Sequence, residues 1–187
     1  MWRASFFVGG VVLAAGLAAP LDAALPASVE ELRTRIAAEA SDPAKAARLF
    51  FDAVFVAVFR DRDAGEAMIT EMCRYKDWRK RSPGFWPRLT NSPEIFRSFA
   101  TGSSPANDYA MDPDGYELLV VSRSDKPYGD KPAGDFVKLF LRSTGADAPR
   151  PMILEKNVRG EFKVREMEGL YTGVKPPRSA GGGSKEF

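Results

Sequence analysis

The 187-residue sequence contains no histidine and one cysteine, Cys73. Without imidazole, a serine–histidine–acid triad, a Cys–His pair and a histidine-bound zinc site are all excluded. A single thiol cannot form an internal disulfide, so the fold must be held by its hydrophobic core. Cys73 lies near the end of an expected helix, where we expect it to be a small buried apolar residue. Catalysis would have to use carboxylate, tyrosine or lysine chemistry.

The sequence also lacks the motifs of two common ligand sites. Its run of glycines, residues 181–183, follows prolines near the C-terminus and does not lie between a strand and a helix, as a phosphate-binding loop does. Asp108, Asp112 and Asp114 precede Gly115, but their spacing does not match the helix–loop–helix calcium pattern. The sequence from Asp112 to Gly115 is typical of a turn. We therefore expect no metal site and no cofactor.

The longest apolar run, residues 6–19, is shorter than the roughly 20 residues that span a bilayer. Arg3 precedes it and small residues follow it, which is the arrangement of a secretory signal. We expect cleavage after Ala23, which gives a signal peptide at residues 1–23. The product is then exported, periplasmic or extracellular, and has no stable transmembrane anchor. No cysteine near the cleavage point could carry the lipid of a bacterial lipoprotein.

The formal net charge is +2, and the predicted signal peptide removes one charge of each sign, Arg3 and Asp22. Such a balance provides no strong positive field, so nucleic acid is not expected as a partner. With 44% hydrophobic residues, the chain can build a sizeable core. We predict one domain over residues 24–177, followed by a disordered tail over residues 178–187.

Helix signals fill the first part of the expected domain. Ser28 and Glu31 form a capping box, and Asp42 followed by Pro43 is a second start signal. Apolar residues then recur at three- and four-residue spacing, as in a helix that packs on a core. The predicted helices span residues 28–39, 43 onward and 63–74, and one short helix spans residues 93–99 within an otherwise irregular region 75–113.

Strand signals follow in the second part. The predicted strands span residues 116–122, 136–142, 151–156 and 162–167. Residues 157–160 suit a hairpin between the last two. This order predicts an α+β domain in which N-terminal helices pack on a curved, four-stranded, mainly antiparallel sheet. The cone-shaped fold of nuclear transport factor 2 (NTF2-like) fits the order and often encloses a pocket, but a fold analogy assigns no function.

Three segments also follow one another in a distinctive order. They are SPANDYAM at residues 104–111, VKLFLRSTGADAPRP at residues 137–151 and LYTGVKPP at residues 170–177. Together they resemble the bacterial family DUF6935, a domain of unknown function, over residues 85–177. Several motifs in the right order are more specific than any one of them. The family has no established catalytic or ligand residues, so the resemblance implies none here.

Asp52 is the weak catalytic candidate, because it is embedded in the most apolar helix. Burial there would raise its pKa toward that of a useful general base. Arg48 lies four residues earlier on the same helical face, and such pairs are usually solvated ion pairs worth about 0.2–0.5 kcal/mol. We favour the surface pair. The alternative is an NTF2-like pocket enzyme that uses Asp52 as a carboxylate general base with a tyrosine.

Residues 74–88 form a basic aromatic segment, with six cations, one anion and four aromatics. Such a mixture could hold an anionic polymer through charge contacts and ring stacking. The competing interpretation, which we favour, puts the aromatics Trp78, Phe85 and Trp86 in the core and leaves the cations in water. The candidate binding residues of this segment are Arg74, Lys76, Trp78, Arg79, Lys80, Arg81 and Trp86.

Arg150 is the last binding candidate. Because it lies between two prolines, its backbone is extended and could present a rigid guanidinium to a carboxylate. The favoured structural alternative is that Arg150 braces Asp147 within the loop.

These features favour a non-catalytic exported module that binds a ligand or a partner, either an anionic envelope component or another exported protein. The alternatives are the pocket enzyme and an envelope structural or assembly protein. An enclosed polar pocket would favour an enzyme, whereas a filled apolar interior would leave surface recognition.

Overall fold

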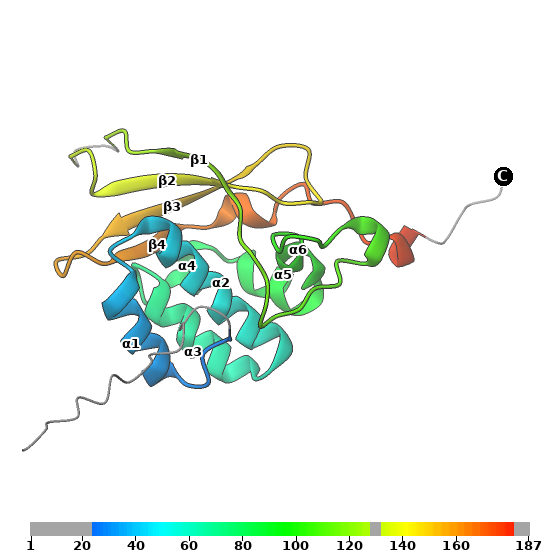
Figure 1. The fold of residues 1–187 in the computed structure, drawn as a ribbon, viewed down its shortest axis with the longest axis horizontal. Helices are drawn as coiled ribbons and strands as arrows, with labels where there is room; N and C mark the ends of the chain where they lie inside the picture. The colour runs from blue at the N-terminus through cyan, green and yellow to red at the C-terminus, as the bar shows by residue number, and fades with distance from the viewer. Residues whose placement is uncertain (1–23, 128–131, 182–187) are drawn as a thin grey trace, which may run out of the picture.

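The computed structural model describes residues 24–127 and 132–181. Helices come first and a four-stranded antiparallel sheet follows, which confirms the predicted α+β class. The helices gather on one side of the sheet (Figure 1). No helix in these two ranges is long and apolar enough to cross a membrane. The predicted signal peptide and residues 182–187 of the predicted tail lie outside the described residues, while residues 178–181 form the 3-10 turn η3, Arg178–Gly181.

The three long helices are α1 Val29–Glu39, α2 Pro43–Phe59 and α3 Arg62–Met72. Each begins after a side chain that accepts hydrogen bonds from the first-turn amides: Ser28, Asp42 and Asp61. Glu31 Oε2 accepts from the N–H of Ala27 at 2.9 Å, one residue before the cap. The predicted helix starts at Ser28 and Asp42 are therefore confirmed.

The region predicted to be irregular contains three short helices, so that prediction was wrong in part. They are α4 Trp78–Arg81, α5 Phe85–Asn91 and α6 Glu94–Arg97, and the 3-10 turn η1 Pro105–Asn107 follows. Pro87, which suggested a loop, lies in the first turn of α5. Pro93 is the N-cap of α6, as expected from the short helix predicted at residues 93–99. A first-turn proline loses no helical hydrogen bond, because the first amides have no partner within the helix.

The sheet has the order β1-β2-β3-β4, with every neighbouring pair antiparallel. Its strands are β1 Val120–Ser124, β2 Phe136–Leu141, β3 Arg150–Lys156 and β4 Phe162–Glu166. β1 starts later than predicted, because the carbonyls of Tyr116 and Glu117 accept hydrogen bonds from Arg48 and Thr101. The predicted β3–β4 hairpin is confirmed: Gly160, at φ 82°, donates its N–H to the Asn157 carbonyl at 3.0 Å.

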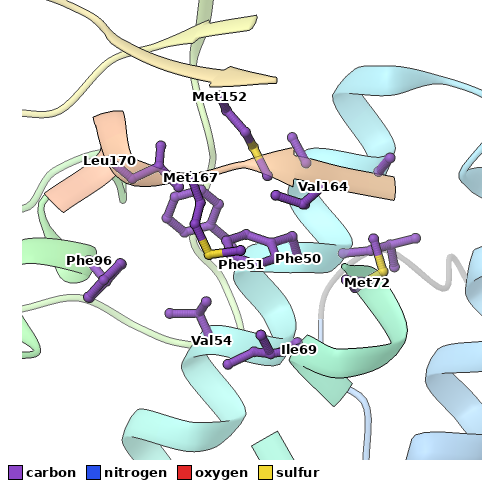
Figure 2. Close-up of a cluster of buried hydrophobic side chains, with 14 of the residues drawn as sticks. Phe50, Phe51, Val54, Ile69, Met72, Phe96, Met152, Val164, Met167 and Leu170 are labelled. Atoms are coloured by element: carbon purple, nitrogen blue, oxygen red, sulfur yellow. The ribbon is translucent and has the colours of Figure 1, made fainter. Parts of the chain in front are cut away.

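The core lies between α2 and the sheet. Phe50, Phe51 and Val54 of α2 face Met152 and Val164 of the sheet (Figure 2). These side chains are at most 1% exposed, so apolar groups fill the space where a cone-shaped fold would hold its pocket. The NTF2-like cone itself stays a prediction.

Cys73 belongs to the same apolar cluster and is 7% exposed, as predicted. Burial raises the pKa of its thiol well above the ordinary value, so the residue is an inert core side chain.

Candidate functional site

The two faces of the sheet differ in chemistry, because successive strand residues point to opposite sides. One face contributes Val137, Leu139 and Leu141 of β2 to the core beneath the helices. On the other face, register places Phe136 opposite Glu155, and Lys138 opposite Ile153. This second, outer face mixes rings, aliphatic groups and charges, so it is the surface to search for a ligand site.

Three adjacent hollows cross the outer face, with volumes of about 210, 110 and 450 Å³. The first and second share Lys138 and Ile153, and the second and third share Glu166 and Glu168. Because neighbouring hollows have lining residues in common, they lie side by side, and together we call them the outer groove. It runs across the strands from the β1–β2 hairpin to α4. Its remaining lining residues are Ser124, Lys126, Pro127, Phe136, Pro151, Gly169, Tyr75, Arg81 and Arg165.

The end of the groove at α4 is built around Glu155, Arg165 and Tyr75, which we call the outer triad. Arg165 Nη1 donates to Glu155 Oε2 at 2.5 Å and to Tyr75 Oη at 2.8 Å. Arg74 Nε lies 3.2 Å from the other Glu155 oxygen, and the Arg81 guanidinium lies 3.9 Å from the centre of the Tyr75 ring. Glu155 is 6% exposed and is held between two guanidiniums, so its charge is compensated.

Charge alternates along the outer groove. Lys126 and Lys138 at one end have no acidic partner among the described residues, although Lys138 lies over the Phe140 ring. Glu166 and Glu168 lie in the middle, where Glu168 accepts from Ser82 Oγ and the Met167 N–H. Arg81 and Arg165 lie at the other end, where they pair with Asp77 and Glu155. The groove therefore suits a ligand that carries both signs better than a uniform polyanion.

The aromatic residues and the cations of the basic aromatic segment, residues 74–88, have different surroundings in the structure. Trp78 and Phe85 are buried in the core, and Trp78 Nε1 donates to Thr70 Oγ1 at 2.9 Å. Trp86 is half-buried and packs against the core. The arrangement matches the interpretation in which the aromatics belong to the fold.

Most cations of this segment have an acidic partner. Besides the Arg74 contact described above, Arg79 pairs with Glu66 at 2.6 Å and stacks 4.3 Å from the centre of the Trp86 ring. Arg81 pairs with Asp77 at 3.0 Å. Within the described residues, Lys76 and Lys80 are the predicted binding cations without such a partner. Only Arg81 of the predicted binding residues lines the outer groove.

Arg150 lies apart from that segment, at the start of β3. Its Nη2 donates to the Gly173 carbonyl at 2.7 Å, so it braces a different segment from the one expected. Asp147 pairs with Lys175 instead, at 2.6 Å. The predicted brace from Arg150 to Asp147 was therefore wrong. The guanidinium ties the start of the strand to the C-terminal segment.

Asp52 forms a second cluster with Arg48 and Tyr116, which we call the inner triad. Its Oδ1 accepts from Arg48 Nε at 2.9 Å and from Tyr116 Oη at 2.7 Å. Asp52 is only 4% exposed, so the prediction of a solvated surface pair was wrong. Burial raises the pKa of Asp52, although Arg48 and Tyr116 oppose the rise. Asp52 and Tyr116 do not line the outer groove, and at 4% and 5% exposure they are closed to ligands in this conformation.

The aspartates before Gly115 form the predicted turn. Asp112 Oδ1 accepts from the Asp114 N–H at 3.0 Å, and Asp114 pairs with Arg60 at 2.6 Å. Within the described ranges, no group of three or more acidic or cysteine side chains is placed to hold a metal ion.

Sequence reasoning missed the outer triad. Glu155 and Arg165 lie on neighbouring strands, and Tyr75 comes from a segment that runs along the edge of β4. Strand alternation could have put Ile153 and Glu155 on the face away from the core. The register that brings Arg165 to Glu155 also depends on an irregularity between Ile153 and Leu154, which has no sequence signal.

The three motif segments meet at one junction near η1 and η3. Tyr109 Oη donates to the Lys175 carbonyl at 2.7 Å, and the Lys175 N–H donates to the Gly145 carbonyl at 2.8 Å. A Cβ atom on Gly145 would lie 2.2 Å from Tyr109 Oη, so only glycine fits there. The segments that carry the family resemblance are thus joined to one another by hydrogen bonds, which is a structural role.

The comparison with known protein families matches almost the whole of the described fold. The sequence pattern of a family described as "Domain of unknown function (DUF6935)" matches residues 24–178. No curated protein and no solved structure matches the chain.

Proposed function

The chain belongs to the DUF6935 family, a domain of unknown function, and we propose that it is an exported, non-catalytic module that binds an extended segment of another exported protein in the outer groove. The observation that carries this proposal is the groove itself, which joins three hollows across the outer sheet face. Export is inferred from the apolar run at residues 6–19 and the charge that precedes it.

The shape and charge of the groove support a polypeptide ligand. The groove is elongated, and Phe136, Pro151 and Ile153 give it apolar surface for side chains. Its positive end at Lys126 and Lys138 and its acidic middle can pair with a segment that carries both signs, as polypeptides commonly do. Because the groove crosses the strands, a bound segment would be recognised through side-chain contacts. It would not add another strand to the sheet.

The burial of the predicted general base supports a binding role. The chain has no histidine, and the one carboxylate predicted as a general base is sealed inside the inner triad. A general base must reach the proton that it removes, directly or through one water. Apolar side chains fill the interior, and this favours recognition at the surface.

Site-specific photocrosslinking in the native host tests the proposal. A crosslinking residue replaces Lys138 in the groove, and a control replaces Lys45, which is exposed at the start of α2. We expect a discrete protein adduct from position 138 only. Tyr75→Ala should reduce that adduct at least about tenfold, because the ring supports Arg81 and Arg165 at the end of the groove.

Two outcomes would contradict this assignment. One is the same adduct from positions 45 and 138, and the other is an adduct that Tyr75→Ala leaves unchanged. An anionic envelope component is the competing partner, supported by Lys76 and Lys80 without acidic partners among the described residues. Anionic vesicles that bind the wild type and fail to bind Lys76→Glu/Lys80→Glu would favour that partner.

A further inference from the structure

A second hollow, of about 240 Å³, lies outside the outer groove, between α1, the end of α3 and the β3–β4 hairpin. We call it the edge hollow. It shares no lining residue with the outer groove. Its lining residues are Arg33, Ile36, Ala37, Glu71, Arg159, Glu161 and Lys163.

Lys163 is the unusual member, because its side chain is only 10% exposed. Its Nζ donates to the Glu71 backbone carbonyl at 3.0 Å and lies 3.8 Å from Glu161 Oε2. An ammonium group has three N–H donors, so one short hydrogen bond leaves it incompletely satisfied. Burial lowers the pKa of Lys163, although Glu161 and Glu71 oppose the change.

The charges that line the edge hollow do not balance. Three cations, Arg33, Arg159 and Lys163, face two carboxylates, Glu71 and Glu161. Arg33 already engages Glu71 at 2.8 Å and Glu30, outside the lining, at 3.2 Å, and Arg159 lies 3.3 Å from Glu161. Arg159 and the buried Lys163 thus share the single Glu161 carboxylate, so negative charge is scarce beside Lys163, where a weakly paired charge is costly.

We propose that the edge hollow binds a small oxyanion, the phosphate or carboxylate group of a low-molecular-weight ligand. The anion adds negative charge beside Lys163 and accepts a hydrogen bond from its Nζ. Arg33 and Arg159 have side chains that are 53% and 72% exposed, so they can turn toward it. Guanidiniums bind oxyanions with paired hydrogen bonds. Ile36 and Ala37 form an apolar wall for the carbon part of the ligand.

Titration of the full chain with inorganic phosphate and, separately, with acetate tests this site. Calorimetry in a low-chloride buffer at pH 7 should show saturable binding of at least one ion. Arg159→Gln should weaken it about tenfold, since a charge-assisted hydrogen bond is lost. Lys163→Met should weaken it further. Arg81→Gln in the outer groove is the matched control and should leave it unchanged.

The two ions distinguish the sources of the oxyanion. Tighter phosphate binding identifies a phosphate-bearing ligand, and tighter acetate binding identifies a carboxylate. If neither ion binds, or if Arg159→Gln and Lys163→Met bind like the wild type, the proposal is overturned. Arg159 is largely exposed, so its variant keeps the test valid even where Lys163→Met folds poorly.

A second readout follows the proton on Lys163. The titratable groups that face it are Glu71, Glu161, Arg33 and Arg159 in the hollow, and the Cys73 thiol, which also feels its charge. A bound anion stabilises the ammonium form, so saturating anion should raise the pKa of Lys163 in an NMR titration. Binding should correspondingly weaken as the pH rises and Lys163 loses its proton. An unchanged Lys163 pKa at saturation contradicts the site.

Discussion

The inner and outer triads contain the same three kinds of group, a carboxylate, an arginine and a tyrosine, in different surroundings. In the inner triad, Tyr116 donates to Asp52 at 2.7 Å, and its ring packs 4.7 Å from that of Phe55. In the outer triad, Arg165 bridges Glu155 and Tyr75 beside a hollow of about 450 Å³. Because the two triads share the same chemistry, access to a ligand is what distinguishes the outer triad, a candidate site, from the inner triad, a structural cluster.

The hydrogen bonds of the two triads also have different roles. Arg48 Nη1 donates to the Tyr116 carbonyl at 2.7 Å, so the inner triad fastens α2 to the segment that precedes β1. The Arg48 guanidinium also lies 3.6 Å from the centre of the Tyr116 ring and closes over it. The Arg165 side chain of the outer triad is as exposed as that of Arg48, at 27%, but Arg165 lines a hollow and the neighbouring Arg74 is 40% exposed, so both can reach water or a ligand.

Removal of the inner carboxylate should have the largest effect on stability. Asp52→Ala leaves a partly buried guanidinium and a buried tyrosine hydroxyl without their acceptor. Breaking such a buried pair costs about 3 kcal/mol. Urea denaturation should show this loss in the free energy of unfolding.

Replacement of both partners is the control for Asp52→Ala. Arg48→Met/Asp52→Leu should recover much of the stability, because neither charge is then left alone. Tyr116 Oη would keep the Arg48 backbone carbonyl as an acceptor, at 3.3 Å. A loss below about 1 kcal/mol in Asp52→Ala would contradict a sealed inner triad.

The corresponding change in the outer triad should cost less. Glu155→Ala removes the acceptor of Arg165 and Arg74, but both guanidiniums can turn to water. We expect a loss of about 1–2 kcal/mol in the same urea measurement. The same variant should weaken ligand binding in the outer groove, whereas Asp52→Asn should not. A cost equal to that of Asp52→Ala would show that the outer triad is equally closed.

The fold was predictable where local signals agree. Ser28, Asp42 and Gly160 mark two helix starts and a hairpin by backbone chemistry alone, and the structure confirms each. The short helix at Pro93 was predicted, whereas the one that contains Pro87 was missed, because proline in a first turn resembles proline in a loop. Their existence depends on core packing of Phe85 and Phe96, which are fully buried.

The candidate site was less predictable, because it depends on contacts between distant segments. Arg48 and Asp52 have the spacing of an exposed ion pair, and only Tyr116, 64 residues beyond Asp52, shows that the pair turns inward. Likewise, Arg74 and Arg81 suggested an open basic surface, yet Glu155 and Asp77 neutralise them. Sequence spacing identified the charged residues but not their partners.

The smallest expected effect is the pH dependence that Asp52 adds to stability. Because burial raises its pKa above the ordinary 3.8, the folded protein holds this proton more tightly than the unfolded chain does. Its contribution is fully present below pH 3.8 and is lost as the pH rises through the raised pKa. The difference in unfolding free energy between wild type and Asp52→Asn should therefore fall with rising pH, by at most about 1.4 kcal/mol per unit. Glu71 is the matched control, because its pKa is lowered chiefly by its hydrogen bond with Arg33. The difference in unfolding free energy between wild type and Glu71→Gln should therefore rise over the same pH range. A wild-type difference from Asp52→Asn that rises with pH would mean that Arg48 and Tyr116 outweigh burial in setting the pKa of Asp52.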